Sequence, residues 1–320
     1  MELPEQTSPL FDGLLSVVVP CKNEVEMIPI FYDEFKKVIT TMGSPKYEII
    51  FVDDGSTDGT LAEIQKLSQS DSQVKFISFT RNFGKESAMY AGLKSARGDY
   101  ITIMDADLQD PPTLLPEMFK AILEEGFDSV ATRRRTRDGE PPVRTFFAKK
   151  FYELLNKVSN LKFVEGARDY RLMTREMLDA VLSLSEYNRF TKGIYEWVGF
   201  KTKWIEFDNV ERVAGQTKWS LWQLAVYSID ALTSFSTIPL VIVSLLGLAF
   251  CVLSAIAIVF LSIRQLLFHN SAYGWTSMIC VIFFLSGIQL FCLGILGQYI
   301  SKIYTETKRR PHYIVGKKSL

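Results

Sequence analysis

The sequence predicts an α/β domain with a mainly parallel sheet, followed by two transmembrane helices. Residues 1 to about 215 alternate short apolar runs with amphipathic stretches, and regular alternation of this kind predicts parallel strands covered by helices on both faces. Two later stretches, Leu240–Ile263 and Trp275–Ile300, contain no charged residue. Each is longer than the roughly 20 residues that cross the hydrocarbon core of a bilayer.

The elements of the domain follow one by one from their local patterns. Apolar runs bounded by turn residues predict strands, and prolines or capping residues before an amphipathic stretch predict helices. The predicted strands are Leu15–Pro20, Tyr47–Val52, Val74–Phe79, Tyr100–Met104 and Asp128–Ala131. The predicted helices are Val25–Thr41, Thr60–Leu67, Lys85–Lys94 and Thr113–Glu125.

The remaining segments complete a domain plan. We expect an N-terminal tail over 1–12, the α/β domain over 13–215, and an amphipathic helix in the membrane interface over 216–238. A first transmembrane helix over 239–264, an external loop over 265–274 and a second transmembrane helix over 275–301 follow. The tail over 302–320 is basic. The positive-inside rule therefore predicts that the tail and the α/β domain lie in the cytoplasm, and that the two helices span the inner (plasma) membrane.

Composition excludes several classes of function. The 36 basic and 36 acidic residues balance to zero, whereas nucleic-acid-binding proteins usually carry a basic excess. The chain has two histidines, which nearly excludes a histidine-based catalytic triad or a His-rich metal site. The four cysteines lie far apart and match neither a disulfide framework nor a zinc site.

Polar clusters follow each of the first four predicted strands. They are Cys21–Glu24, Asp53–Thr60, Arg81–Lys85 and Asp105–Asp110. In parallel sheets the carboxyl ends of neighbouring strands share one edge, where ligands bind. Four clusters at one edge therefore predict a single site.

The strongest of these signals is the spacing Asp105-x-Asp107-x-Gln109. Two carboxylates and an amide oxygen suit Mg²⁺ or Mn²⁺. Mg²⁺ is commonly held by one or two carboxylates together with substrate phosphates, so the pattern favours a metal–diphosphate substrate. The first strand is not followed by Gly-x-Gly-x-x-Gly, and the chain lacks a Walker lysine loop, which disfavours nicotinamide and P-loop chemistry.

Taken together, the motifs resemble those of family-2 glycosyltransferases of GT-A fold. The resemblance rests on Val18–Glu24, Val52–Thr60, Arg81–Lys85, Asp105–Pro112, Asp169–Met173, Asn188–Phe190, Ala214–Lys218 and the two-span hairpin. The branch that it resembles is the polyprenyl-phosphate glycosyltransferases, including the bactoprenol glucosyl transferases of the GtrB type, which are related to dolichol-phosphate mannose synthase.

The resemblance implies a role for each matching residue. The nucleotide sugar would be bound by Pro20, Asn23, Glu24, Asp53, Lys85, Asp105 and Ala106. The metal would be held by Asp105, Asp107 and Gln109. Asp169, Asp107 and Arg189 would carry the reaction, and the acceptor phosphate would meet Arg189, Arg212 and Lys218. One departure is Arg168, which stands where relatives commonly have a small residue.

The reaction implied is inverting, metal-dependent transfer of a sugar, first of all glucose, from a UDP-sugar to undecaprenyl (polyprenyl) phosphate at the cytoplasmic membrane face. The partners implied are the UDP-sugar, the polyprenyl phosphate, the bilayer and a second copy of the chain in a homo-oligomer. Three alternatives stay open: the same reaction with UDP-N-acetylglucosamine, a processive polysaccharide synthase, and a non-catalytic membrane scaffold that binds nucleotide sugar. The second needs further spans and a Gln-x-x-Arg-Trp motif, where this chain has Asn188-Arg189-Phe190.

Overall fold

The structure is a computed structural model that describes residues 9–135, 153, 156–157, 163–208, 233, 236–268 and 274–320. The chain forms two compact units. The first consists of Met1–Leu221 with Arg310–Leu320, and the second is Trp222–Arg309. The interfacial helix predicted over 216–238 falls mostly outside the described residues, as do Arg212 and Lys218.

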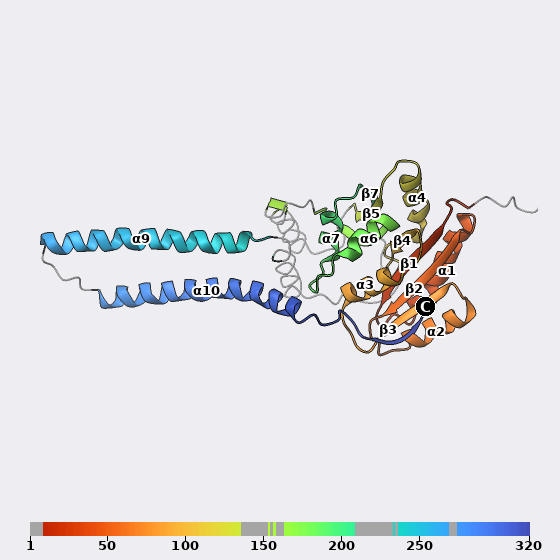
Figure 1. The fold of residues 1–320 in the computed structure, drawn as a ribbon, viewed down its shortest axis with the longest axis horizontal. Coiled ribbons are helices and arrows are strands. Elements are labelled where there is room, and N and C mark those ends of the chain that lie inside the picture. The colour runs from red at the N-terminus through yellow and green to blue at the C-terminus, as the bar shows by residue number, and fades with distance from the viewer. Residues whose placement is uncertain are drawn as a thin grey trace, which may run out of the picture. The chain divides into compact units, whose positions relative to one another are not determined.

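Four parallel strands form the centre of the first unit (Figure 1). They are β1 (Leu14–Cys21), β2 (Lys46–Asp53), β3 (Val74–Phe79) and β4 (Tyr100–Ile103). Seven of the eight residues in β1, and likewise in β2, are buried, as expected of strands covered on both faces. The strands lie within one or two residues of their predicted bounds, which confirms this part of the prediction.

Helices follow these strands in the predicted order. They are α1 (Met27–Thr41), α2 (Thr60–Ser70), α3 (Lys85–Ser95) and α4 (Leu115–Leu123), the last preceded by a short 3-10 turn, η1 (Pro112–Leu114). Aromatic side chains from α1 and α4, among them Phe31, Phe35 and Phe119, are fully buried in the core. The alternation of strand and helix thus produces the layered α/β core.

Close packing fixes the position of α3 on the sheet. Its buried residues include Ala88, Ala91 and Gly92, which allow the helix to approach the strands closely. A Cβ atom at Gly92 would lie 2.2 Å from Val18 Cγ1 and 3.2 Å from Val52 Cγ2. The small residues therefore set where the first turn of α3 meets the strand ends.

The second half of the domain contains β5, predicted at Asp128–Ala131 and observed at Ser129–Arg134, and further strands that the sequence did not indicate. The sheet order is β7-β5-β6-β4-β1-β2-β3-β8, in which β8 is Val315–Ser319 near the end of the chain. Strand β6 (Ala167–Thr174) pairs antiparallel with both β4 and β5 (Ser129–Arg134), and β7 (Thr202–Phe207) pairs parallel with β5. Helices α6 (Arg175–Ser183) and α7 (Thr191–Trp197) follow β6. The sheet is therefore mixed but mostly parallel, in agreement with the predicted class.

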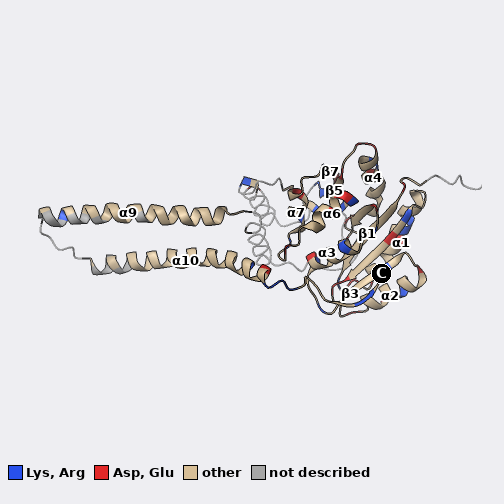
Figure 2. Ribbon diagram, in the orientation of Figure 1, with Lys and Arg blue, Asp and Glu red and all other residues tan. Residues whose placement is uncertain are grey.

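Two long helices make up most of the second unit. They are α9 (Ile238–Phe268) and α10 (Trp275–Thr307), and Figure 2 shows them almost free of charged residues. Candidate membrane spans lie at Ile238–Ala257 and Val281–Thr307, with mean hydropathies of 2.7 and 1.9 and none of either apolar window buried. Helices this apolar and this exposed are suited to lipid surroundings.

The end of the chain returns to the first unit. Helix α10 continues beyond residue 301 to Thr307, and residues Val315–Ser319 form β8, which pairs antiparallel with β3. The ring of Tyr313 stacks on Phe79 with 4.8 Å between centroids. The segment predicted as a basic tail thus contains an edge strand of the domain sheet.

Candidate active site

The polar clusters predicted from the sequence do meet at one edge of the sheet. Strands β1 to β4 run parallel in the order β4-β1-β2-β3, so their carboxyl ends share an edge. The ends of these four strands and the segments that follow them carry the residues predicted to bind the nucleotide sugar and the metal. The parallel arrangement therefore brings together residues that are far apart in the chain.

The turns after β1 and β2 are tied to each other by hydrogen bonds. The Asn23 backbone N–H donates to Ser56 Oγ at 2.9 Å, and Asn23 Oδ1 accepts from the Thr57 N–H at 2.9 Å. Asn23 has a positive φ of 55°, a conformation that asparagine adopts more readily than most residues. Pro20, predicted beside it, is buried in β1. These hydrogen bonds hold together the two turns that carry the residues predicted to bind the nucleotide.

Asp53 is held firmly at the end of β2. It is 1% exposed. Its Oδ1 accepts from the Ser56 N–H at 3.0 Å and its Oδ2 accepts from the Ser78 hydroxyl at 2.7 Å. Both carboxylate oxygens thus already stabilise the strand ends, and the nucleotide contact predicted for Asp53 has to use their remaining lone pairs.

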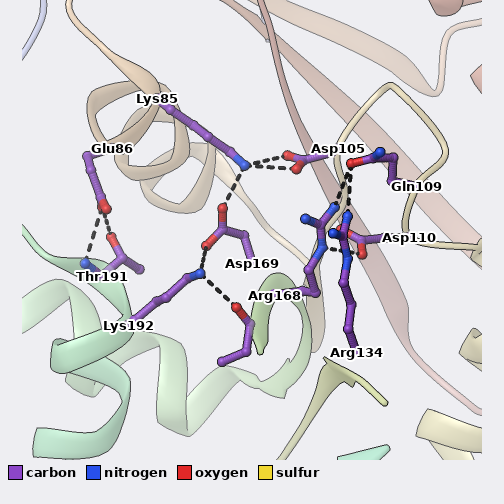
Figure 3. A network of polar contacts seen from close by, with 11 residues as sticks. Lys85, Glu86, Asp105, Gln109, Asp110, Arg134, Arg168, Asp169, Thr191 and Lys192 are labelled. Carbon is purple, nitrogen blue, oxygen red and sulfur yellow. Dashed lines mark hydrogen bonds and ion pairs between the residues drawn. The ribbon is translucent and has the colours of Figure 1, made fainter. Parts of the chain in front are cut away.

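An ammonium group lies between two carboxylates at the centre of the site (Figure 3). Lys85, the first residue of α3, places Nζ 2.7 Å from Asp105 Oδ1, 2.8 Å from Asp105 Oδ2 and 2.6 Å from Asp169 Oδ2. Asp105 follows β4 and Asp169 lies on β6. On the other side of Asp169, Lys192 Nζ lies 3.6 Å from Oδ1. The antiparallel strand β6 is what brings Asp169 to the edge where β1 to β4 end.

These contacts set the protonation state of Asp169. Burial acts to raise the pKa of its carboxyl group, but the charges of Lys85 and then Lys192 outweigh it and hold that pKa well below its usual range. For Lys85, burial acts to lower the pKa, and the charges of Asp105 and Asp169 raise it well above its usual range. Asp169 is therefore an anion near neutral pH and a weak base.

A second cluster of charged side chains surrounds Gln109. Its Oε1 accepts from Arg134 at 3.1 Å and from Arg168 at 3.4 Å, and Arg168 Nε donates to Asp110 Oδ1 at 2.8 Å. Burial raises the pKa of Asp110 to about 6, although the charge of Arg168 opposes the shift. Arg168, the departure noted in the sequence, thus pairs with a buried carboxyl group beside the site (Figure 3).

The acidic loop after β4 fits a hard divalent cation with few protein ligands. Asp105 is partly exposed and faces Asp169 across Lys85. Asp107 Oδ1 accepts from the Gln109 N–H at 3.1 Å. Across the described ranges, no three His, Cys, Asp or Glu side chains gather where they could hold a metal ion. Asp105 and Asp107 would therefore need ligands from a substrate, as Mg²⁺ commonly does, while the Gln109 amide oxygen is shared with two guanidinium groups.

Arg189 makes contacts that shape the loop before α7. Its guanidinium donates to the carbonyl oxygens of Leu184 and, at 3.3 Å, Val181, and lies 4.4 Å from the centre of the Tyr90 ring. Close by, Glu86 accepts from both the backbone N–H and the hydroxyl of Thr191. These contacts link α3 to the start of α7. The other predicted acceptor residues, Arg212 and Lys218, are not among the described residues.

Several residues of the site had no assigned role at the level of sequence. Asp54, 4% exposed, accepts from the Phe83 N–H at 2.6 Å and from the Gly84 N–H at 3.0 Å, so it anchors the loop that leads into Lys85. The doubled aspartate after β2 was a signal for it. Lys192 had no such signal, because only the packing of α7 brings it to Asp169.

Comparison with known proteins gives consistent matches over most of the chain. Residues 16–182 match the family described as Glycosyl transferase family 2. The chain is 41% identical over 301 residues to a prophage bactoprenol glucosyl transferase homolog of Escherichia coli K12, covering 94% of this chain and 98% of that protein. It is also 41% identical over 303 residues to the bactoprenol glucosyl transferase of Shigella phage SfII, covering 95% and 97%.

A solved structure of similar fold is a mannosyltransferase from Pyrobaculum calidifontis, determined in complex with GDP-Man and Mn²⁺. The TM-score is 0.50 and the identity 20%, over 71% of this chain and 65% of that one. At this identity the likeness concerns the fold alone.

Proposed function

The chain belongs to glycosyl transferase family 2, and on that premise we propose that it transfers glucose from UDP-glucose to undecaprenyl phosphate. The observation that carries the proposal is the match to bactoprenol glucosyl transferases, which extends over 94% of this chain. A match of that length takes in the α/β domain of GT-A fold and at least most of α9 and α10. The reaction proposed for this chain is therefore that of a membrane-bound polyprenyl-phosphate glycosyltransferase.

The donor would bind at the carboxyl ends of β1, β2 and β4. Pro20, Asn23, Glu24 and Asp53 are proposed to line the nucleoside pocket, with Ala106 beside the diphosphate. Asp105 and Asp107, with Gln109 as a further candidate, would hold Mg²⁺ or Mn²⁺. When bound, the cation neutralises charge on the departing UDP.

The chain's own groups would then direct the acceptor. An acceptor phosphate oxygen attacks the anomeric carbon, a new carbon–oxygen bond forms, and the bond to the UDP β-phosphate oxygen breaks on the opposite side, which inverts the configuration. Phosphate monoesters have a second pKa of about 6, so the nucleophile is already anionic at neutral pH. Asp169, which the Lys85 and Lys192 ammonium groups hold ionised, would accept a hydrogen bond from a sugar hydroxyl and orient it.

Binding of the acceptor phosphate is proposed for cationic residues near the membrane. Arg212 and Lys218 remain the predicted contacts. Arg189 is also a predicted contact, and its guanidinium already supports the loop before α7. Arginine offers a fork of donors to phosphate and lysine a mobile point charge.

The connectivity of the chain supports the proposed membrane arrangement. Strand β8 comes after α10 and belongs to the same sheet as β3, so two spanning helices in between would enter and leave the membrane on one side. The basic residues after α10 favour the cytoplasmic side. We infer a catalytic domain at the cytoplasmic face of the inner membrane, and a homo-oligomer remains part of the proposal.

The direct test uses purified full-length protein with undecaprenyl phosphate, Mg²⁺ and a panel of UDP-sugars. Mass spectrometry of the lipid fraction should show a hexosyl phospholipid with UDP-glucose. A product with UDP-N-acetylglucosamine in preference to UDP-glucose would support the alternative donor. Absence of a lipid product and of released UDP with every donor would contradict the proposal and favour a binding scaffold.

A further inference from the structure

Lys85 occupies the place next to Asp105 where a cation is expected. Its ammonium lies 2.7 and 2.8 Å from the two carboxylate oxygens of Asp105. Among the described residues, no other side chain makes a hydrogen bond or ion pair to this carboxylate. A divalent cation that takes either oxygen of Asp105 would meet the positive charge of Lys85 within a few ångströms, where the repulsion between the two is strong.

The Lys85 side chain can move although its backbone cannot. The backbone on either side is fixed by the hydrogen bonds of Asp54 to the Phe83 and Gly84 N–H groups and by the packing of Gly92 on Val18. The side chain, in contrast, is 44% exposed, and a lysine carries its charge on a flexible four-carbon stem. The ammonium can therefore leave Asp105 without any shift of α3.

A second carboxylate would keep the ammonium in the site after such a move. Asp169 Oδ2 lies 2.6 Å from Lys85 Nζ, so the charge has a partner at the reaction centre when Asp105 is taken by another cation. An incoming diphosphate brings negative charge that can pair with the same ammonium. Lys85 thus has an anionic partner both with and without donor in the site.

We propose that Lys85 is an internal counter-ion that fills the cation position of the donor-free enzyme, so that the metal binds together with the nucleotide diphosphate and not before it. This rests on the proposed function, because it takes Asp105 as a metal ligand. Lys85 then has two tasks: it keeps the carboxylates of Asp105 and Asp169 paired in the absence of donor, and it moves towards the diphosphate when donor and metal arrive.

The test measures Mn²⁺ binding to full-length protein in detergent by electron paramagnetic resonance, with and without UDP and without any turnover. Wild-type protein should bind Mn²⁺ weakly alone and at least tenfold more tightly with saturating UDP. Lys85→Met should strengthen binding without UDP by about tenfold or more, since it removes a like charge a few ångströms away.

Two matched variants test whether the effect of Lys85→Met on Mn²⁺ binding comes from the lost charge or from a change in structure. Lys85→Arg keeps the positive charge and should bind Mn²⁺ without UDP as weakly as wild type. Lys192→Met removes a positive charge that faces Asp169 at 3.6 Å but does not contact Asp105, so it should leave Mn²⁺ affinity without UDP unchanged.

The outcomes distinguish this inference from the proposed function. If Mn²⁺ binds with UDP but Lys85→Met binds it without UDP no better than wild type, the counter-ion role is wrong and the metal site stands. If wild-type protein binds Mn²⁺ equally tightly with and without UDP, the counter-ion role of Lys85 is also wrong, and no variant is needed to show it. If UDP induces no Mn²⁺ binding, and Asp105→Asn changes nothing, the metal site itself is wrong and the inference fails with it.

Discussion

Replacement of Asp54 by asparagine tests how the loop before α3 positions Lys85. The Asp54 carboxylate is buried and accepts hydrogen bonds from two consecutive backbone N–H groups, those of Phe83 and Gly84. Gly84 has a φ of 96°, so the chain turns sharply there and enters α3 at the next residue. An asparagine keeps the size of the side chain but offers one acceptor oxygen. Its NH₂ group, which is itself a donor, would face one of these backbone N–H groups.

The expected loss of stability follows from the weaker acceptor. The Gly84 N–H also donates to Asn82 Oδ1 at 2.9 Å, so an asparagine at position 54 leaves no backbone donor unpaired but replaces a charged acceptor with a neutral one. Hydrogen bonds to charged groups contribute about 1.5–3 kcal/mol and neutral ones about 0.5–1.5 kcal/mol, so Asp54→Asn should lower the free energy of unfolding by about 1–2 kcal/mol. A displaced loop also moves the Lys85 ammonium away from Asp105 and Asp169. Because a misplacement of about 1 Å can cost about a hundredfold in rate, we expect kcat/KM to fall by roughly ten- to a hundredfold.

The assay compares Asp54→Asn with Asp71→Asn, a matched variant remote from the site. Asp71 likewise accepts hydrogen bonds, from the Tyr32 hydroxyl at 2.7 Å, the Gln73 N–H at 2.9 Å and the Tyr47 hydroxyl at 3.4 Å. It lies between α2 and β3, away from the site. Thermal unfolding and UDP release with UDP-glucose are measured for both. Loss of stability with wild-type kcat/KM in Asp54→Asn would refute the positioning argument; loss of kcat/KM in that variant alone supports it.

Three further predictions address packing, protonation and the metal. Gly92→Ala should lower the thermal midpoint of unfolding, because the added Cβ would lie 2.2 Å from Val18 Cγ1 and overpacking costs about 1–3 kcal/mol. The control is Gly247→Ala, whose added Cβ would have no heavy atom within 4 Å. Equal midpoints of the two variants would contradict the close approach of α3 to β1. Burial raises the pKa of Asp110 from 3.8 to about 6, so the folded state binds a proton that the unfolded state releases between these values. Stability should therefore fall as pH rises through this window, by up to about 3 kcal/mol relative to Asp110→Asn, and parallel stability curves of the two proteins from pH 4 to 6.5 would contradict the shift. Removal of divalent metal with EDTA should abolish glucose transfer and added Mg²⁺ or Mn²⁺ should restore it; undiminished transfer after chelation would rule out the metal.

The elements that sequence predicted well have strong local signals. Strands β1 to β4 are almost continuously buried, so each appears as an apolar run that ends at polar turn residues. The parallel arrangement of four such strands was enough to predict that Asp53, Lys85 and Asp105 would meet at one edge. This part of the site depends only on strand order and direction.

The elements that were missed depend on tertiary contacts. Strand β6 contains Arg168, Asp169 and Arg171, so it has no apolar run. Arg171 is 3% exposed and its guanidinium lies 4.4 Å from the Tyr195 ring centre; this burial becomes possible only when α7 packs against the strand. Strand β8 is exposed along its whole length and is held by hydrogen bonds to β3, which a single-strand pattern does not indicate.

The same reasoning explains which parts of the site were not foreseen. The pairing of Arg168 with Asp110 and the approach of Lys192 to Asp169 join residues from different elements. No spacing in the sequence encodes these distances. The motifs predicted that the acidic residues after β4 are metal ligands, and the geometry shows that a lysine pairs with one of them, Asp105.

The most direct measurement is the anomalous scattering of Mn²⁺ in crystals of the full-length protein grown with UDP-glucose. The proposed function predicts one Mn²⁺ peak in contact with the carboxylates of Asp105 and Asp107 and with the diphosphate, with Asp169 facing the sugar. Nucleotide bound away from the ends of β1, β2 and β4, or Mn²⁺ on the diphosphate without contact to either carboxylate, would contradict the proposed reaction centre.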